Sequence, residues 1–198
     1  MSRRQASALI LAGGQSSRFG SDKALAIFRG ESLLARAVRT ACAEFAQVAV
    51  VSKEPQRYAA LVAEVESLPA ALVADGNDSA TPLAGLVAGL GWCPAEVAFA
   101  FAVDMPFAVD EPLLDALEAA LSSGDHDAAA PRRAGQLEPL CALYRRKPAL
   151  EAGRTLLVKN AGPSALLRAL RTAVVDWPDE TPFLDADTRA DLEALERR

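Results

Sequence analysis

The residue types best suited to chemistry gather in residues 9–23, LILAGGQSSRFGSDK. The segment opens with an apolar run typical of a buried strand and then reaches Gly13 and Gly14. Glycine lets the backbone approach a ligand closely, and bare amide groups together with Arg18 and Lys23 suit a polyphosphate. We therefore expect a strand that leads into a phosphate-binding loop.

The loop does not match the best-known phosphate motifs. A Walker A loop needs GxxxxGK[ST], whereas Lys23 does not directly follow Gly20. The GxGxxG fingerprint of dinucleotide-binding proteins is also missing. On spacing alone, an ordinary strand-to-helix turn with a solvated Arg and Lys stays open as the alternative.

A carboxylate follows the most strongly apolar run of the chain. Residues 97–103, VAFAFAV, are typical of a strand at the centre of a parallel sheet, and Asp104 comes directly after them. Open α/β sheets bind ligands at the carboxyl ends of their strands. A carboxylate there suits Mg²⁺, which takes one or two protein carboxylates plus phosphate oxygens and water. The alternative is that Asp104 is a plain turn residue.

The elements that must position these residues alternate between strand and helix. This alternation predicts an α/β protein with a mainly parallel, Rossmann-like sheet between two helical layers. The 198 residues predict a single domain, 1–198. We expect strands at 8–11, 48–51, 71–74, 97–103, 128–130, 137–144 (a candidate antiparallel strand) and 173–175, and helices at 32–42, 55–64, from 82 onward, at 110–121, 149–170 with a break at 162–163, and 189–195.

Composition excludes several classes of protein. With 51% hydrophobic and 24% charged residues the chain is globular rather than disordered, and a net charge of −5 argues against a nucleic-acid or membrane surface. Cys42, Cys93 and Cys141 form no CxxC pair, as expected of reduced thiols, and His126 is the only histidine. The first apolar run is too short for a signal peptide or a membrane span. We expect a cytoplasmic protein.

The loop resembles the LAGGxSxRMGxDK signature of molybdenum cofactor guanylyltransferases, which belong to the nucleotidyltransferases with the nucleotide-diphospho-sugar transferase fold. Phe19 stands where this signature usually has Met. Related cytidylyltransferases tend to read LAAG and lack the Asp before the Lys, so Gly14 and Asp22 favour the guanylyl branch.

Later segments extend the resemblance over most of the chain. Residues 82–85, PLAG, are similar to the family's PGPLAG segment, with Thr81 in place of Gly, and residues 104–106 are its DMP. Residues 183–188, FLDADT, are similar to its FxNxNT, with Asp at both Asn positions. Those Asp residues loosen the guanylyl assignment, because related nucleotidyltransferases often have them.

The resemblance implies Mg²⁺-dependent transfer of GMP from GTP to the terminal phosphate of molybdopterin, with release of pyrophosphate. It also implies transient contact with molybdoenzymes or cofactor-synthesis proteins. Implied as catalytic are Lys23, Arg18 and Asp104; as metal ligands Asp104 and Asp187; and as nucleotide-binding residues Leu11, Ala12, Gly13, Gly14, Lys23, Ser52, Asp75, Pro82, Leu83, Gly85 and Asp104.

Two other functions stay open from the sequence. One is a cytidylyltransferase or sugar-phosphate nucleotidyltransferase of the same fold. The other is a nucleotide-binding regulator without catalysis, although a pure binder would not need the paired carboxylates Asp104 and Asp187.

Overall fold

One mixed β-sheet forms the middle of the molecule. A computed structural model describes residues 3–13, 19, 22–65, 70–76 and 81–197. The strands run in the order β10-β7-β9-β6-β1-β4-β5, and β8 pairs with β7. Their bounds are β1 (Arg4–Leu11), β4 (Phe45–Ser52), β5 (Ala71–Ala74), β6 (Val97–Ala102), β7 (Ala128–Arg133), β8 (Gln136–Leu137), β9 (Cys141–Arg145) and β10 (Thr172–Asp176), with a separate hairpin of β2 (Ile27–Phe28) and β3 (Glu31–Ser32).

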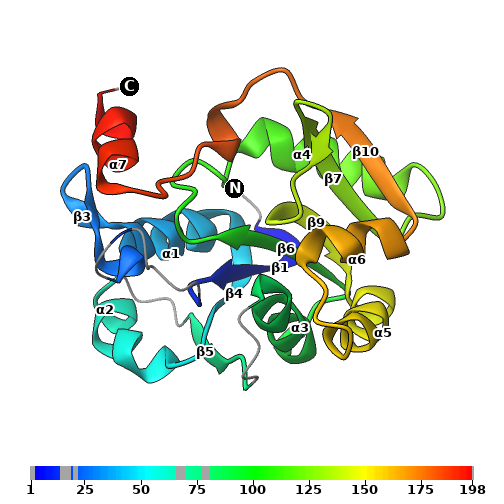
Figure 1. Ribbon diagram of the computed structural model, residues 1–198, viewed down its shortest axis with the longest axis horizontal. Helices are drawn as coiled ribbons and strands as arrows, with labels where there is room; N and C mark the ends of the chain where they lie inside the picture. The colour runs from blue at the N-terminus through cyan, green and yellow to red at the C-terminus, as the bar shows by residue number, and fades with distance from the viewer. Residues whose placement is uncertain (1–2, 14–18, 20–21, 66–69, 77–80, 198) are drawn as a thin grey trace.

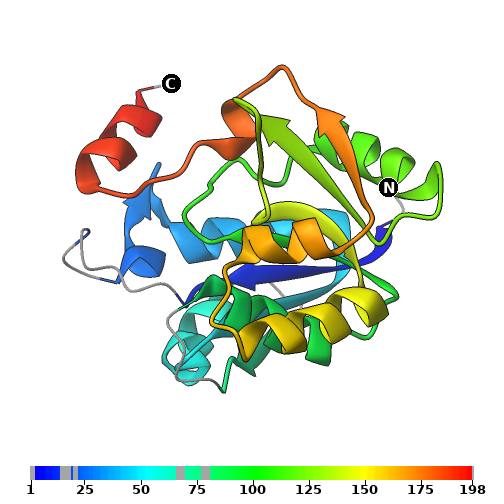
Figure 2. The ribbon, with the colours of Figure 1, turned by 45° about the vertical axis from the view of Figure 1, so that its right-hand side comes forward.

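Helices cover both faces of the sheet, which gives three layers (Figure 1). One face carries α1 (Leu33–Glu44), α2 (Ala59–Glu64) and α4 (Glu111–Ser122), and the other carries α3 (Pro82–Trp92), α5 (Arg146–Leu157) and α6 (Pro163–Ala169). Short 3₁₀ helices lie at η1 (Lys23–Leu25), η2 (Pro55–Tyr58) and η3 (Thr181–Phe183). The last helix, α7 (Arg189–Glu196), lies beside the β2–β3 hairpin at one corner (Figure 2). The predicted three-layer α/β fold is confirmed.

Burial on both faces explains why the central strands are mostly apolar. In β1, Ala8 and Ile10 face the layer of α1 and α4, whereas Leu9 and Leu11 face the layer of α3. Successive side chains of a strand point to opposite faces, so apolar residues are favoured at every position of a strand that is covered on both sides. The same reasoning applies to β6, which pairs with β1 on one side and with β9 on the other.

Side-chain caps start two helices where the sequence predicts them. The Ser32 hydroxyl accepts a hydrogen bond from the Ala35 amide at 3.1 Å, and the Asp110 carboxylate accepts one from Leu113 at 2.9 Å. Each cap satisfies an amide that has no partner within its helix. These caps fix the first turns of α1 and α4.

The predicted strand at residues 137–144 was wrong in its bounds. A turn at residues 138–140 separates β8 from β9, because Pro139 has no amide hydrogen and the Glu138 amide donates instead to Pro131 at 3.0 Å. The predicted antiparallel direction is confirmed, since β9 is antiparallel to both β6 and β7. The predicted helix at 55–64 begins as the 3₁₀ turn η2 before it becomes α2.

Candidate active site

The predicted site residues gather at one edge of the sheet. Strands β1, β4, β5 and β6 are parallel neighbours, so their carboxyl ends lie at the same edge. Gly13, Ser52, Asp75 and Asp104 lie at or just after those ends. This is where open α/β sheets bind ligands.

Gly13, Ser52 and Asp75 form one side of the site. A Cβ atom built on Gly13 would lie 3.6 Å from the Asp75 Oδ2 atom and 3.6 Å from the Ser52 Cα atom. The Asp75 amide donates to the Ser52 carbonyl at 3.0 Å, which fixes the two strand ends together. The Ser52 hydroxyl is buried and has no hydrogen-bond partner among the described residues. This side of the site therefore offers polar groups beside exposed glycine backbone.

Other predicted nucleotide-binding residues have packing contacts. The Leu11 carbonyl accepts from Val103 at 3.1 Å and the Ala12 amide donates to Val51 at 2.8 Å, so both groups serve the sheet. Leu83 is fully buried, and a Cβ atom on Gly85 would point at the Leu11 and Val51 side chains, at 3.6 and 3.9 Å. Pro82 is exposed at the start of α3. The contacts of these residues with a nucleotide stay predictions.

Lys23 lies between the two carboxylates predicted to hold a metal. Its ammonium nitrogen is 2.7 Å from Asp104 Oδ2 and 2.9 Å from Asp187 Oδ1. The exposed fraction of the side chain is 14% for Lys23, 20% for Asp104 and 54% for Asp187. Three residues from distant parts of the chain thus form one charged cluster.

Backbone contacts bring this cluster together. The Ala186 amide donates to the Asp104 carbonyl at 3.0 Å, which places Asp187 next to the end of β6. Burial by itself would lower the pKa of Lys23, but the hydrogen bonds and negative charges of Asp104 and Asp187 raise it above its ordinary value. Lys23 is therefore protonated at neutral pH.

The donor set of this cluster fits a magnesium ion. Both carboxylates reach one ammonium nitrogen, so one divalent cation can contact both. Within the described residues, no group of three or more His, Cys, Asp and Glu side chains could hold a metal. Mg²⁺ does not need such a group, because it takes one or two carboxylates together with substrate phosphates and water.

Additional acidic groups border the cluster. Loss of hydration and the charges of Asp187 and Asp104 raise the pKa of Asp185 above its ordinary value. Burial raises the pKa of Glu138, and the positive charge of Arg133 partly offsets this increase. Sequence reasoning gave no role to Glu138, because nothing in its spacing connects it with Asp185.

Some of the remaining basic and glycine residues either are not described by the structure or contact other parts of the protein. Gly14 and Arg18 are outside the described residues. The basic residues at the end of β7 also have partners within the protein: Arg132 forms two hydrogen bonds with Asp176, at 2.7 and 2.8 Å. Arg133 donates to the Phe183 carbonyl at 3.2 Å.

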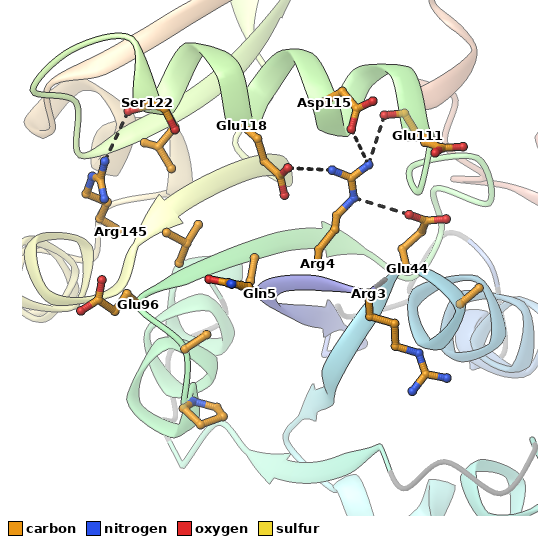
Figure 3. Close-up of a pocket in the computed structure, with 16 residues that line it drawn as sticks. Arg3, Arg4, Gln5, Glu44, Glu96, Glu111, Asp115, Glu118, Ser122 and Arg145 are labelled. Atoms are coloured by element: carbon orange, nitrogen blue, oxygen red, sulfur yellow. Dashed lines mark hydrogen bonds and ion pairs between the residues drawn. The ribbon is translucent and has the colours of Figure 1, made fainter. Parts of the chain in front are cut away.

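The opposite edge of the sheet carries a large groove of about 1010 Å³. Arg4 dominates it and lies 2.8 Å from Glu118, 2.7 Å from Asp115 and 3.5 Å from Glu44 (Figure 3). These ion pairs join the start of β1 to α4 and to α1. The groove lies at the amino end of β1, far from Asp104, and its central cation is already neutralised. We therefore place the active site at the carboxyl edge instead.

Comparison with known proteins identifies the family of the chain. The sequence profile of the MobA-like NTP transferase domain matches residues 8–174. The chain belongs to the MobA-like NTP transferase family. A probable molybdenum cofactor guanylyltransferase of Natronomonas pharaonis is 32% identical to this member over 96% of each chain. A molybdenum cofactor guanylyltransferase of Rhodopseudomonas palustris is 31% identical over 96% of this chain and 92% of its own.

Solved structures confirm the fold of this family member. Molybdopterin-guanine dinucleotide biosynthesis protein A from Archaeoglobus fulgidus superposes with a TM-score of 0.78 over 96% of this chain and 97% of its own, at 20% identity. A 2-C-methyl-D-erythritol 4-phosphate cytidylyltransferase from Thermus thermophilus superposes with a TM-score of 0.67 over 96% of each chain, at 19% identity. In the part of the chain that the structure describes, no helix has the length and apolarity needed to cross a membrane.

Proposed function

We propose that this protein transfers GMP from GTP to the terminal phosphate of molybdopterin, in a Mg²⁺-dependent reaction. The observation that carries the proposal is the contact of Lys23 with both Asp104 and Asp187, in a chain that belongs to the MobA-like NTP transferases. Relatives that are 31% and 32% identical over almost the whole chain are named molybdenum cofactor guanylyltransferases, which supports guanine as the base.

The chemistry needs positioning more than proton transfer. An oxygen of the acceptor phosphate forms a bond to the α-phosphorus of GTP while the bond from that phosphorus to the bridging oxygen breaks, and pyrophosphate leaves. The attacking phosphate is already anionic, so no general base is required. His126 lies away from the site, where its carbonyl accepts from Arg145 at 2.8 Å beside the groove at the opposite edge.

One side of the site would bind the base and ribose, and the other would bind the triphosphate and the metal ion. Gly13, Ser52 and Asp75 would receive the base and ribose, because exposed backbone and polar groups meet there. Lys23 would leave its two carboxylates and bind the triphosphate as a point charge. Asp104 and Asp187 would then hold Mg²⁺, which when bound neutralises phosphate charge and orients the reacting groups.

Binding of the four nucleotides tests the choice of base. We expect GTP with Mg²⁺ to bind at least tenfold more tightly than CTP, ATP or UTP in calorimetric titrations, a difference of about 1.4 kcal/mol. A polar pocket rejects the wrong base because buried groups are left unpaired. Release of pyrophosphate in the presence of molybdopterin and GTP would complete the test. A preference for CTP would instead indicate a molybdopterin cytidylyltransferase.

A further inference from the structure

A second set of contacts fixes the short helix that carries Lys23. Asp22 precedes η1, and its Oδ1 atom accepts a hydrogen bond from the Ala24 amide at 3.1 Å, which caps that helix. Its Oδ2 atom accepts from the Tyr58 hydroxyl at 2.9 Å and lies 3.2 Å from a guanidinium nitrogen of Arg57. Both oxygens of one carboxylate are thus occupied, one locally and one by a distant element.

Tyr58 is a rigid anchor for this carboxylate. Its side chain is 2% exposed and belongs to the same core cluster as Ala24. Burial and the hydrogen bond to Asp22 raise the pKa of Tyr58 far above its ordinary value, so the hydroxyl stays a donor at neutral pH. Arg57 is half-exposed, and water weakens its ion pair with Asp22. The tyrosine is therefore the stronger of the two contacts from η2.

The connection that carries Tyr58 also begins in the active site. It leaves the sheet at Ser52, the last residue of β4, and reaches Tyr58 at the end of η2. One hydrogen bond thus links the element beside Gly13 to the element that carries Lys23.

We propose that Tyr58, acting through Asp22, is a positioning residue that fixes η1 in place, so that the Lys23 side chain reaches the part of the site where the triphosphate would bind. The proposal rests on the proposed function in that it takes Lys23 to act on the nucleotide. A helix of three residues does not hold its own shape, and a lysine side chain has many rotamers to lose. The Asp22 cap therefore fixes the position of η1 and of the Lys23 ammonium, and the hydrogen bond from Tyr58 fixes the position of Asp22.

A double-mutant cycle tests whether Tyr58 acts through Lys23. Tyr58→Phe keeps the buried ring and removes only the hydroxyl. We expect it to lower kcat/KM for GTP about tenfold and to weaken GTP binding measured by calorimetry, while Tm stays within a few degrees of wild type. In the Lys23→Ala background the same change should alter both quantities less than twofold, because the side chain that it positions is absent.

A matched control and the alternative outcomes make the cycle decisive. Tyr144→Phe removes the other tyrosine hydroxyl, which donates to the Pro139 carbonyl at 2.7 Å, and its effect should be equal in both backgrounds. An equal effect of Tyr58→Phe in both backgrounds would overturn the positioning role while leaving the proposed function intact. If Lys23→Ala binds and turns over GTP like wild type, the role of Lys23 fails, and the positioning role fails with it.

A second variant covers the case in which Tyr58→Phe does not fold. Asp22→Asn keeps an oxygen for the Ala24 amide but loses the charge that Tyr58 and Arg57 contact. It should show the same lack of additivity with Lys23→Ala. Additive losses from Asp22→Asn would overturn the proposal.

Discussion

The ammonium nitrogen of Lys23 lies 2.7 Å from Asp104 Oδ2, at the end of the central strand β6. The Lys23 ammonium, at the start of η1, therefore occupies the position in which a metal cation would contact this carboxylate. Asp187, at 2.9 Å from the same nitrogen, completes the cluster. A divalent cation bound by the same two carboxylates, as proposed above, would compete with Lys23 for them.

This competition predicts that Lys23→Met strengthens metal binding in the absence of nucleotide. We expect the Kd for Mn²⁺, measured by electron paramagnetic resonance, to fall about tenfold, while binding of GTP weakens. The matched control is Lys147→Met, at the opposite edge of the sheet, which should change neither. An unchanged Mn²⁺ affinity in Lys23→Met would contradict the competition.

Asp104→Asn should remove most of the Mg²⁺-dependent turnover and leave the fold intact. The amide keeps the shape of the carboxylate but not its charge, a loss of several kcal/mol of charge stabilisation in the metal complex. The backbone bond between Ala186 and Asp104 is unaffected, so Tm should change little. Turnover within tenfold of wild type, which is only ~1.4 kcal/mol, would mean that Asp104 is not a metal ligand.

Gly13→Ala should weaken nucleotide binding more than it destabilises the protein. The added methyl group would lie at ordinary contact distance, 3.6 Å, from Asp75 and Ser52, so the fold accommodates it, but it fills space next to the proposed base site. We expect the Kd for GTP to rise at least tenfold in calorimetry. Gly91→Ala is the control, because a Cβ there meets nothing within 4 Å, and it should leave the Kd unchanged.

The lowered pKa of Asp127 leads to a prediction of how the stability of the protein depends on pH. Hydrogen bonds from Arg171, at 2.7 and 2.8 Å to its side chain, lower the pKa of the buried Asp127 carboxylate. A lowered folded pKa means that the pair stabilises the protein above the pKa of the unfolded Asp, near pH 4, and that this contribution disappears as pH falls through the folded value. Asp127→Asn should therefore lower Tm at pH 7, by about 2–4 °C for each kcal/mol lost.

The same variant should approach wild-type stability at low pH. There the wild-type carboxyl group is protonated and therefore neutral, like the amide of the variant. Asp176→Asn serves as the control, because Asp176 also forms two hydrogen bonds with an arginine but is exposed. Exposed ion pairs contribute little, so its Tm should stay close to wild type at both pH values. A difference between wild type and Asp127→Asn that does not shrink in acid would argue against this charge-dependent stabilisation.

The sequence by itself determined the order of elements and the family. Apolar runs, helix periodicity and the capping residues Ser32 and Asp110 act over a few neighbours, so they predict the central strands and the starts of α1 and α4 correctly. The glycine-rich loop carried the resemblance that comparison with known proteins confirms. The apolar run at residues 97–103 also marked Asp104 at the end of a central strand, because burial on both faces can be read from the local pattern.

Only the tertiary structure decided which side chains meet. Lys23 and Asp187 lie 164 positions apart, and Asp22 and Tyr58 lie 36 apart, so no local pattern reports either contact. Strand order also needs the whole sheet, since β9 enters antiparallel between β6 and β7. Pairing of this kind depends on long-range packing, whereas the sequence pattern of a strand reports only its burial.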